Sequence, residues 1–219
     1  MAGIVPKSVG TCLHCFTYEC VGLLWTEYIR YIQMAAKEIF MIPKIFEGQE
    51  DNIATKTPFF GKLPKDVVEA YDWNRHMDML DTHPPEKVDS NSSKFRIGLN
   101  VFHGRPSAPE FAKEIQDQMT DFFALHGDKR SITNIAFTGF GQESDSYPWH
   151  KDSMDVFLVQ VISTIGLRVE GVNNNEEFDF HPGDYVFLPR GTHHQIFPRI
   201  SRATFSFGVE GEPDPSVYF

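Results

Sequence analysis

Two short segments of this sequence carry side chains of the kind that bind metal ions. The first is the run Tyr147-Pro-Trp-His-Lys-Asp152. Side chains alternate along a strand, so His150 and Asp152 would point to one face while Lys151 points to the other. An imidazole and a carboxylate from one segment could then bind the same metal ion. The spacing alone is weak evidence, because roughly one His-x-Asp is expected by chance in a chain of this composition.

A second His-x-Asp, His76-Met77-Asp78, has the same spacing. No strand pattern surrounds it, and no paired-histidine motif follows it at a suitable distance. We therefore set it aside.

The second segment runs from Phe180 to His194 and has a more specific order. A turn glycine is followed by a five-residue strand, a Pro189-x-Gly191 turn and, three residues after that glycine, His194. The order resembles the second motif of the cupin superfamily, and in that register His194 is the metal ligand. A bend at Pro-x-Gly would aim this histidine into a barrel. If the strand register slipped by one residue, His193 would take its place.

Together the two segments supply two histidines and one carboxylate. His150, Asp152 and His194 would form the facial triad of non-haem Fe(II) oxygenases, which leaves coordination positions open. Cupins with four protein ligands carry a second histidine where this chain has Asp152. The carboxylate therefore favours an oxygenase.

The elements that must position these residues are mainly strands. A helix is predicted at 108–126, where Ser107 and Glu110 form a capping-box pattern and Gly127 follows the end. From residue 131 onward the pattern changes to short β-type runs separated by turn residues. These runs are 132–138, 156–162, 166–170, 184–188 and 203–209. The fold predicted is mainly β with flanking helices, a double-stranded β-helix or jelly roll.

The first part of the chain has a different character. Residues 16–42 have apolar residues at mixed helical spacing, and Pro43 ends the pattern. We expect residues 1–44 to be an N-terminal helical segment that covers the sheet or pairs with a second subunit in a homodimer. Residues 45–219 would form the catalytic domain, with a loop-rich stretch at 45–95 and the barrel core at about 95–210.

Composition narrows the classes of partner. The chain has 219 residues, of which 41% are hydrophobic, and a formal charge of −10, so duplex DNA is not an expected partner. We read no membrane span and no signal peptide. Cys12, Cys15 and Cys20 lie too close together for a disulfide framework or for typical zinc-ligand pairs, which favours free thiols and a cytoplasmic location.

A family resemblance covers roughly residues 131–209. The run His150-Lys-Asp-Ser-Met-Asp-Val-Phe-Leu-Val-Gln160, then Gly166-x-Arg168, then Pro-Gly-Asp…Leu-Pro-Arg-Gly-x-x-His194 resembles the Jumonji-C family. The similarity is greatest to its cupin-like protein hydroxylases, including the ribosomal oxygenases. Membership would imply Fe(II), 2-oxoglutarate as cosubstrate and O2. The reaction implied is hydroxylation of a protein side chain or a small molecule, with release of succinate and CO2.

The distal carboxylate of 2-oxoglutarate needs a cation, and two arginines are candidates. Arg168 follows a hairpin glycine by two positions, where the family has a basic residue, and we favour it slightly. Arg202-Ala203-Thr204 resembles the Arg-x-Ser/Thr arrangement of other 2-oxoglutarate oxygenases. Alternation along that strand would place Arg202 and Thr204 on a polar face.

Two other functions remain open from the sequence. One is a metal-dependent cupin enzyme that does not use 2-oxoglutarate, in which neither arginine would point toward the metal. The other is a non-catalytic metal-binding cupin.

Overall fold

The computed structural model describes residues 42–82, 95–99, 101–102, 107–144 and 146–211. Apart from Ile42, the predicted helix at 16–42 and the three cysteines lie outside these ranges. The chain divides into a unit of residues 1–41 and a unit of residues 42–219. Within the described ranges, no helix has the length and apolar character needed to cross a membrane.

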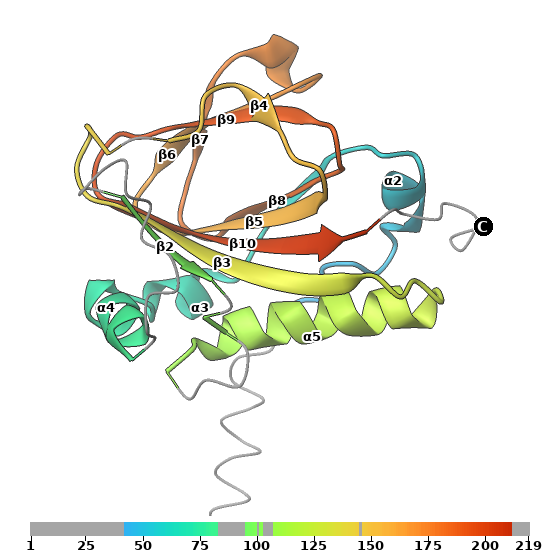
Figure 1. Ribbon diagram of the computed structural model, residues 1–219, viewed down its shortest axis with the longest axis horizontal. Helices are drawn as coiled ribbons and strands as arrows, with labels where there is room; N and C mark the ends of the chain where they lie inside the picture. The colour runs from blue at the N-terminus through green and yellow to red at the C-terminus, as the bar shows by residue number, and fades with distance from the viewer. Residues whose placement is uncertain (1–41, 83–94, 100, 103–106, 145, 212–219) are drawn as a thin grey trace, which may run out of the picture. The chain divides into compact units, whose positions relative to one another are not determined.

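The larger unit contains two antiparallel sheets that face one another. The six-stranded sheet has the order β1-β8-β5-β10-β3-β2, and the four-stranded sheet has the order β4-β9-β6-β7. In Figure 1 the four-stranded sheet lies on one side of the six-stranded sheet and helix α5 lies on the other. The predicted double-stranded β-helix is confirmed. The strands are β1 (Phe59–Lys62), β2 (Phe95–Leu99), β3 (Ser131–Gly139), β4 (His150–Lys151), β5 (Asp155–Ile162), β6 (Ile165–Val169), β7 (Phe178–Phe180), β8 (Asp184–Leu188), β9 (His193–Phe197) and β10 (Arg202–Glu210).

Helix α5 (Glu110–Leu125) covers the outer face of the six-stranded sheet. Its Phe111, Ile115 and Met119 repeat at helical spacing and are buried in the core that also contains Phe205 and Phe207 of β10. Because aromatic side chains bury large apolar areas, the packing of α5 on the six-stranded sheet stabilises that sheet.

The start of α5 differs from the prediction. Pro109 is the N-cap and makes no side-chain cap bond. The Ser107 hydroxyl instead contacts the Thr82 hydroxyl, 2.8 Å away. The capping box was therefore wrong, because a tertiary contact takes the cap side chain. Gly127 follows the helix end with a φ of 73°, as the sequence indicated.

The stretch predicted to be loop-rich contains short elements. They are α2 (Glu50–Ala54), β1, α3 (Lys65–Glu69) and α4 (Trp73–Asp81), and a 3-10 helix η1 (Asn173–Asn175) occurs later in the chain. The prediction for this stretch was wrong in part. Elements of four or five residues are too short to show a hydrophobic period, but the nine-residue α4, which buries His76 and Met79, was also missed. Of this stretch, Val67, Val68 and Met79 are buried in the core on the outer side of the six-stranded sheet.

Candidate metal centre and cosubstrate pocket

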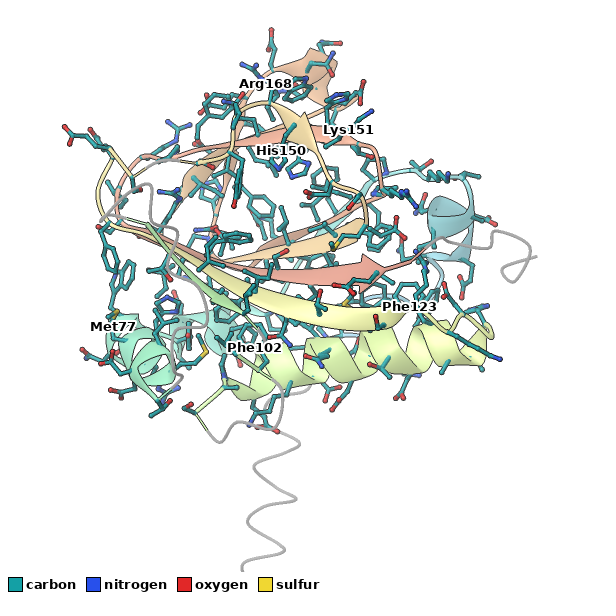
Figure 2. All side chains as sticks on the ribbon, in the orientation of Figure 1. Met77, Phe102, Phe123, His150, Lys151 and Arg168 are labelled. Atoms are coloured by element: carbon teal, nitrogen blue, oxygen red, sulfur yellow. The ribbon has the colours of Figure 1, made fainter. Side chains whose placement is uncertain are left out.

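His150 and His194 meet across two strands of the four-stranded sheet. They are register partners in the pairing of β4 with β9. Their ring centroids are 4.4 Å apart. Figure 2 shows His150 on the inner side of β4, in the space between the two sheets, whereas Lys151 lies on the outer side. Directly opposed residues share a face, so both imidazoles point into the same space.

Asp152 completes the cluster from the segment after β4. Its Oδ1 lies 3.8 Å from His150 Nε2, and its Oδ2 lies 3.5 Å from His194 Nε2. One ligand atom from each of the three residues lies within 4.8 Å of the others. Metal–ligand bonds of about 2.1 Å place neighbouring ligand atoms roughly 3–4 Å apart, so this donor set fits one divalent ion.

The backbone fixes which nitrogen of each ring faces the cluster. His150 Nδ1 lies 2.7 Å from the Pro148 carbonyl oxygen, and His194 Nδ1 lies 3.2 Å from the Thr192 carbonyl oxygen. A carbonyl only accepts, so each Nδ1 carries the proton and donates it. Each Nε2 therefore keeps its lone pair for a metal, which is the usual outer-shell arrangement of ligating histidines.

Burial keeps the His194 imidazole neutral. The residue is 5% exposed, and desolvation lowers its pKa below the ordinary histidine value despite the nearby Asp152 carboxylate. A neutral ring is the form that binds a metal.

His193 points the opposite way from its neighbour. Its Nδ1 lies 2.9 Å from Glu170 Oε2, and its ring stacks on Trp149 with centroids 5.7 Å apart. The hydrogen bonds from His193 lower the pKa of the Glu170 carboxyl. The alternative register, with His193 in the cluster, is thus not the one adopted.

The cluster opens onto a cavity of about 310 Å³ between the two sheets. Its walls are mostly apolar, from residues such as Phe137, Met154 and Ile196, and Tyr147 stands beside His150 with ring centroids 5.4 Å apart. Apolar walls that carry a few convergent polar groups are typical of small-molecule and cofactor sites.

Arg202 lies in this same cavity, on the six-stranded sheet. Arg202, Thr204, Ser206 and Gly208 of β10 all line it, whereas the phenylalanines between them point toward α5. Arg202 is 3% exposed, and burial lowers its pKa to about 10, so the guanidinium is still cationic at neutral pH. A buried cation inside a cavity is costly unless an anion or hydrogen-bond acceptors face it.

Two residues that sequence reasoning missed hold the Arg202 side chain. Its Nη1 donates to Ser144 Oγ, and that hydroxyl donates to the Gly141 carbonyl, 2.8 Å away. Gly139 is the register partner of Arg202, and a Cβ there would overlap the guanidinium. No local pattern marks these two positions, because the pairing of β3 with β10 brings Gly139 to Arg202 and the turn after β3 brings Ser144 there.

Thr204 is linked to a buried polar group of the neighbouring strand β5. Its hydroxyl donates to Gln160 Oε1 at 2.6 Å, and Gln160 Nε2 donates to the Ile162 carbonyl at 2.7 Å. The hydroxyl proton of Thr204 is therefore committed to Gln160, and its lone pairs remain available as acceptors.

Arg168 lies on the outer face of the four-stranded sheet, as Figure 2 shows. Its neighbours Leu167 and Val169 are buried between the sheets, so alternation turns Arg168 outward. Its guanidinium lies 5.0 Å from the centroid of the Phe197 ring and 5.7 Å from that of Trp149. Arg168 does not line the cavity. This placement argues against Arg168, which the sequence slightly favoured over Arg202, as the residue that binds 2-oxoglutarate.

The rejected His76-Met77-Asp78 lies on α4, where His76 is buried on the far side of the six-stranded sheet.

Comparison with known proteins gives matches in structure only. No protein-family model matches the chain, and no curated protein matches it. A prolyl-4-hydroxylase from Pseudomonas putida superposes with a TM-score of 0.58 at 14% identity, over 76% of this chain and 100% of that one. The Escherichia coli ribosomal oxygenase YcfD superposes with a TM-score of 0.54 at 16% identity, over 80% of this chain and 54% of that one.

A second YcfD structure, in complex with cobalt and 2-oxoglutarate, superposes with a TM-score of 0.52 at 16% identity, over 76% of this chain and 52% of that one. The aligned part thus spans about half the length of YcfD. At these identities the likeness concerns the fold. The chain shares its double-stranded β-helix fold with these solved structures.

Proposed function

We propose that this protein is an Fe(II)- and 2-oxoglutarate-dependent oxygenase that hydroxylates a protein side chain or a small molecule, with release of succinate and CO2. One observation carries the proposal. A three-ligand cluster on one sheet and a buried arginine on the facing sheet line the same cavity. A dicarboxylate could reach from one to the other.

Each residue has a distinct task in this proposal. His150, Asp152 and His194 hold Fe(II), which supplies the oxidative chemistry when bound together with 2-oxoglutarate and O2. Arg202 binds the distal carboxylate of 2-oxoglutarate through its forked N–H donors. Thr204 offers acceptor lone pairs beside Arg202, and the apolar walls exclude water.

The placement of the two arginines favours this function over a cupin enzyme that does not use 2-oxoglutarate. That alternative predicts that neither arginine points toward the metal, whereas Arg202 lines the cavity that the cluster also lines. A non-catalytic metal-binding cupin would bind metal without any turnover of 2-oxoglutarate.

The test is an anaerobic titration of the protein with Fe(II) and then 2-oxoglutarate. We expect a weak visible charge-transfer band that needs both additions and disappears when N-oxalylglycine replaces 2-oxoglutarate. Admission of O2 should then convert 2-oxoglutarate to succinate. Metal binding without the band would favour the cupin alternatives, and no metal binding would overturn the proposal.

A further inference from the structure

A buried aspartate lies close to the candidate metal centre without facing it. Asp155 is the first residue of β5 and is 4% exposed. The next residue, Val156, lines the cavity, so Asp155 points to the opposite face of the strand. Buried carboxylates are rare unless they are paired, so we expect Asp155 to have specific partners.

Both oxygens of Asp155 bind groups from distant parts of the chain. Oδ1 accepts the backbone N–H of Arg190 at 2.7 Å. Oδ2 accepts a hydrogen bond from Arg130 Nη1. The carboxylate therefore ties the start of β5 to the turn between β8 and β9 and to the segment that follows α5.

The turn held by Asp155 contacts two of the three candidate ligands. It consists of residues 189–192, between β8 and β9. The Gly191 N–H donates to the carbonyl oxygen of Asp152 at 3.1 Å. The Thr192 carbonyl accepts from His194 Nδ1 at 3.2 Å. A displacement of this turn would move the Asp152 backbone and the His194 ring together.

Arg130 holds the Asp155 carboxylate in its orientation. Its Nε donates to Asp128 at 2.9 Å, and its guanidinium lies 5.2 Å from the centroid of the Phe123 ring on α5. Burial alone would lower the pKa of Arg130, but hydrogen bonds to Asp128 and Asp155 outweigh it and hold the pKa above its ordinary value. The arginine is thus a fixed cation between two carboxylates.

We propose that Asp155 is a positioning residue for the metal centre. It fixes the turn at 189–192 from the side of the sheet opposite the cavity, and that turn sets the separation of Asp152 and His194. The proposal rests on the proposed function, because it assigns a purpose to the separation of two proposed ligands. Outer-shell residues of this kind commonly change metal affinity about 10- to 100-fold when they are lost.

The test compares Asp155→Asn with a matched variant, Asp184→Asn. Asp184 is also a buried first residue of a strand. It accepts one backbone N–H, from His181 at 2.8 Å, and faces two basic side chains, that of Lys62 at 3.0 Å and the His181 ring at 3.5 Å. It lies at the opposite end of β8 from the turn at 189–192. In Asp155→Asn the side chain keeps only one acceptor oxygen, whereas both partners of Asp155, the Arg190 N–H and the Arg130 guanidinium, are donors. One of the two Asp155 contacts must therefore be lost.

Co(II) affinity and the Co(II) visible spectrum are the readouts, measured with thermal stability on the full chain. We expect Asp155→Asn to weaken Co(II) binding about tenfold and to shift the spectrum, while Asp184→Asn changes the affinity less than about twofold at a similar loss of stability. Unchanged affinity and spectrum in Asp155→Asn, or an equal loss in Asp184→Asn, would overturn the inference.

A second measurement separates this inference from the proposed function. In the metal-free protein, the amides of residues 190–192 should exchange hydrogen faster in Asp155→Asn than in the wild type. If the wild type itself binds no Co(II), the proposed function fails and the positioning of ligands falls with it. If the wild type binds Co(II) but the turn exchanges at the wild-type rate in the variant, only the inference fails.

Discussion

The two sheets differ in what covers their outer faces. The six-stranded sheet is covered on its outer face by α5, and β5 is buried along its whole length. The four-stranded sheet has its inner face on the cavity, while its outer face carries exposed Lys151 and half-buried His193. Both sheets contribute to the cavity, but only one of them also has a solvent-accessible outer face.

This difference changes how far a charged side chain is desolvated in each sheet. On the four-stranded sheet an outward arginine can extend over Trp149 and Phe197, as Arg168 does. In the six-stranded sheet, β10 is buried from Arg202 to Val209, and Arg202 bears a desolvation cost that lowers its pKa. A buried cation on the second kind of sheet is therefore the stronger indication of a binding site.

The largest expected effect is a difference in metal affinity between variants on the two faces of β9. His194→Ala should weaken Mn(II) binding by more than about 100-fold, because a ligand matters more than the outer-shell residues that support it. The neighbouring variant His193→Ala removes a ring of the same kind from the outer face and should leave the affinity nearly unchanged. Isothermal titration of both variants checks this, and equal losses would contradict the inward assignment of His194.

The second effect concerns the covered outer face of the six-stranded sheet. His76 is buried there between the Tyr71 hydroxyl at 2.9 Å and the Thr138 hydroxyl at 2.8 Å, and burial lowers its pKa from 6.5 to about 4. As pH falls from 6.5 toward 4, the unfolded state binds a proton that the folded state does not. The free energy of unfolding should then drop by about 3 kcal/mol, and it should recover as pH rises above 6.5.

Denaturant unfolding of the wild type and of His76→Gln across this pH range measures that effect. The variant lacks the titrating group, so its free energy of unfolding should change less steeply with pH. Parallel pH profiles would show that His76 is not the group responsible.

The third effect compares the two arginines directly. Arg202→Met should weaken 2-oxoglutarate binding by about 30-fold, or about 2 kcal/mol, because charge-assisted hydrogen bonds are lost. Arg168→Met should change it little. Titration of 2-oxoglutarate into the Mn(II)-loaded proteins measures both affinities. A larger loss of affinity in Arg168→Met would show that Arg168, and not Arg202, binds 2-oxoglutarate.

The smallest effect concerns two strand glycines. A Cβ at Gly139 would overlap the Arg202 guanidinium, whereas a Cβ at Gly166 would overlap the end of the Glu177 side chain, which is 33% exposed. Gly139→Ala should therefore weaken 2-oxoglutarate binding about tenfold through displacement of Arg202, and Gly166→Ala should not. Equal affinities in the two variants would show that Gly139 does not hold Arg202 in place.

Much of the fold was readable because its signals are local. The run at 184–188 coincides with β8, and α5 lies within the helix predicted at 108–126. Turn glycines and apolar periodicity depend on neighbouring residues only, so they survive in a single sequence. The two-residue strand β4 and the elements of four or five residues at 50–69 are too short to carry such a signal.

The sequence by itself determined the chemical types of the cluster, namely two imidazoles and a carboxylate with His194 next to the Pro-x-Gly turn. The tertiary structure decided which way the side chains point: His194 inward and His193 outward, Arg202 inward and Arg168 outward. It also decided which unmarked residues support them, such as Gly139 beneath Arg202 and Asp155 behind the turn. The physical reason is that strand pairing joins residues far apart in the chain, and one step along a strand reverses the face on which a side chain lies.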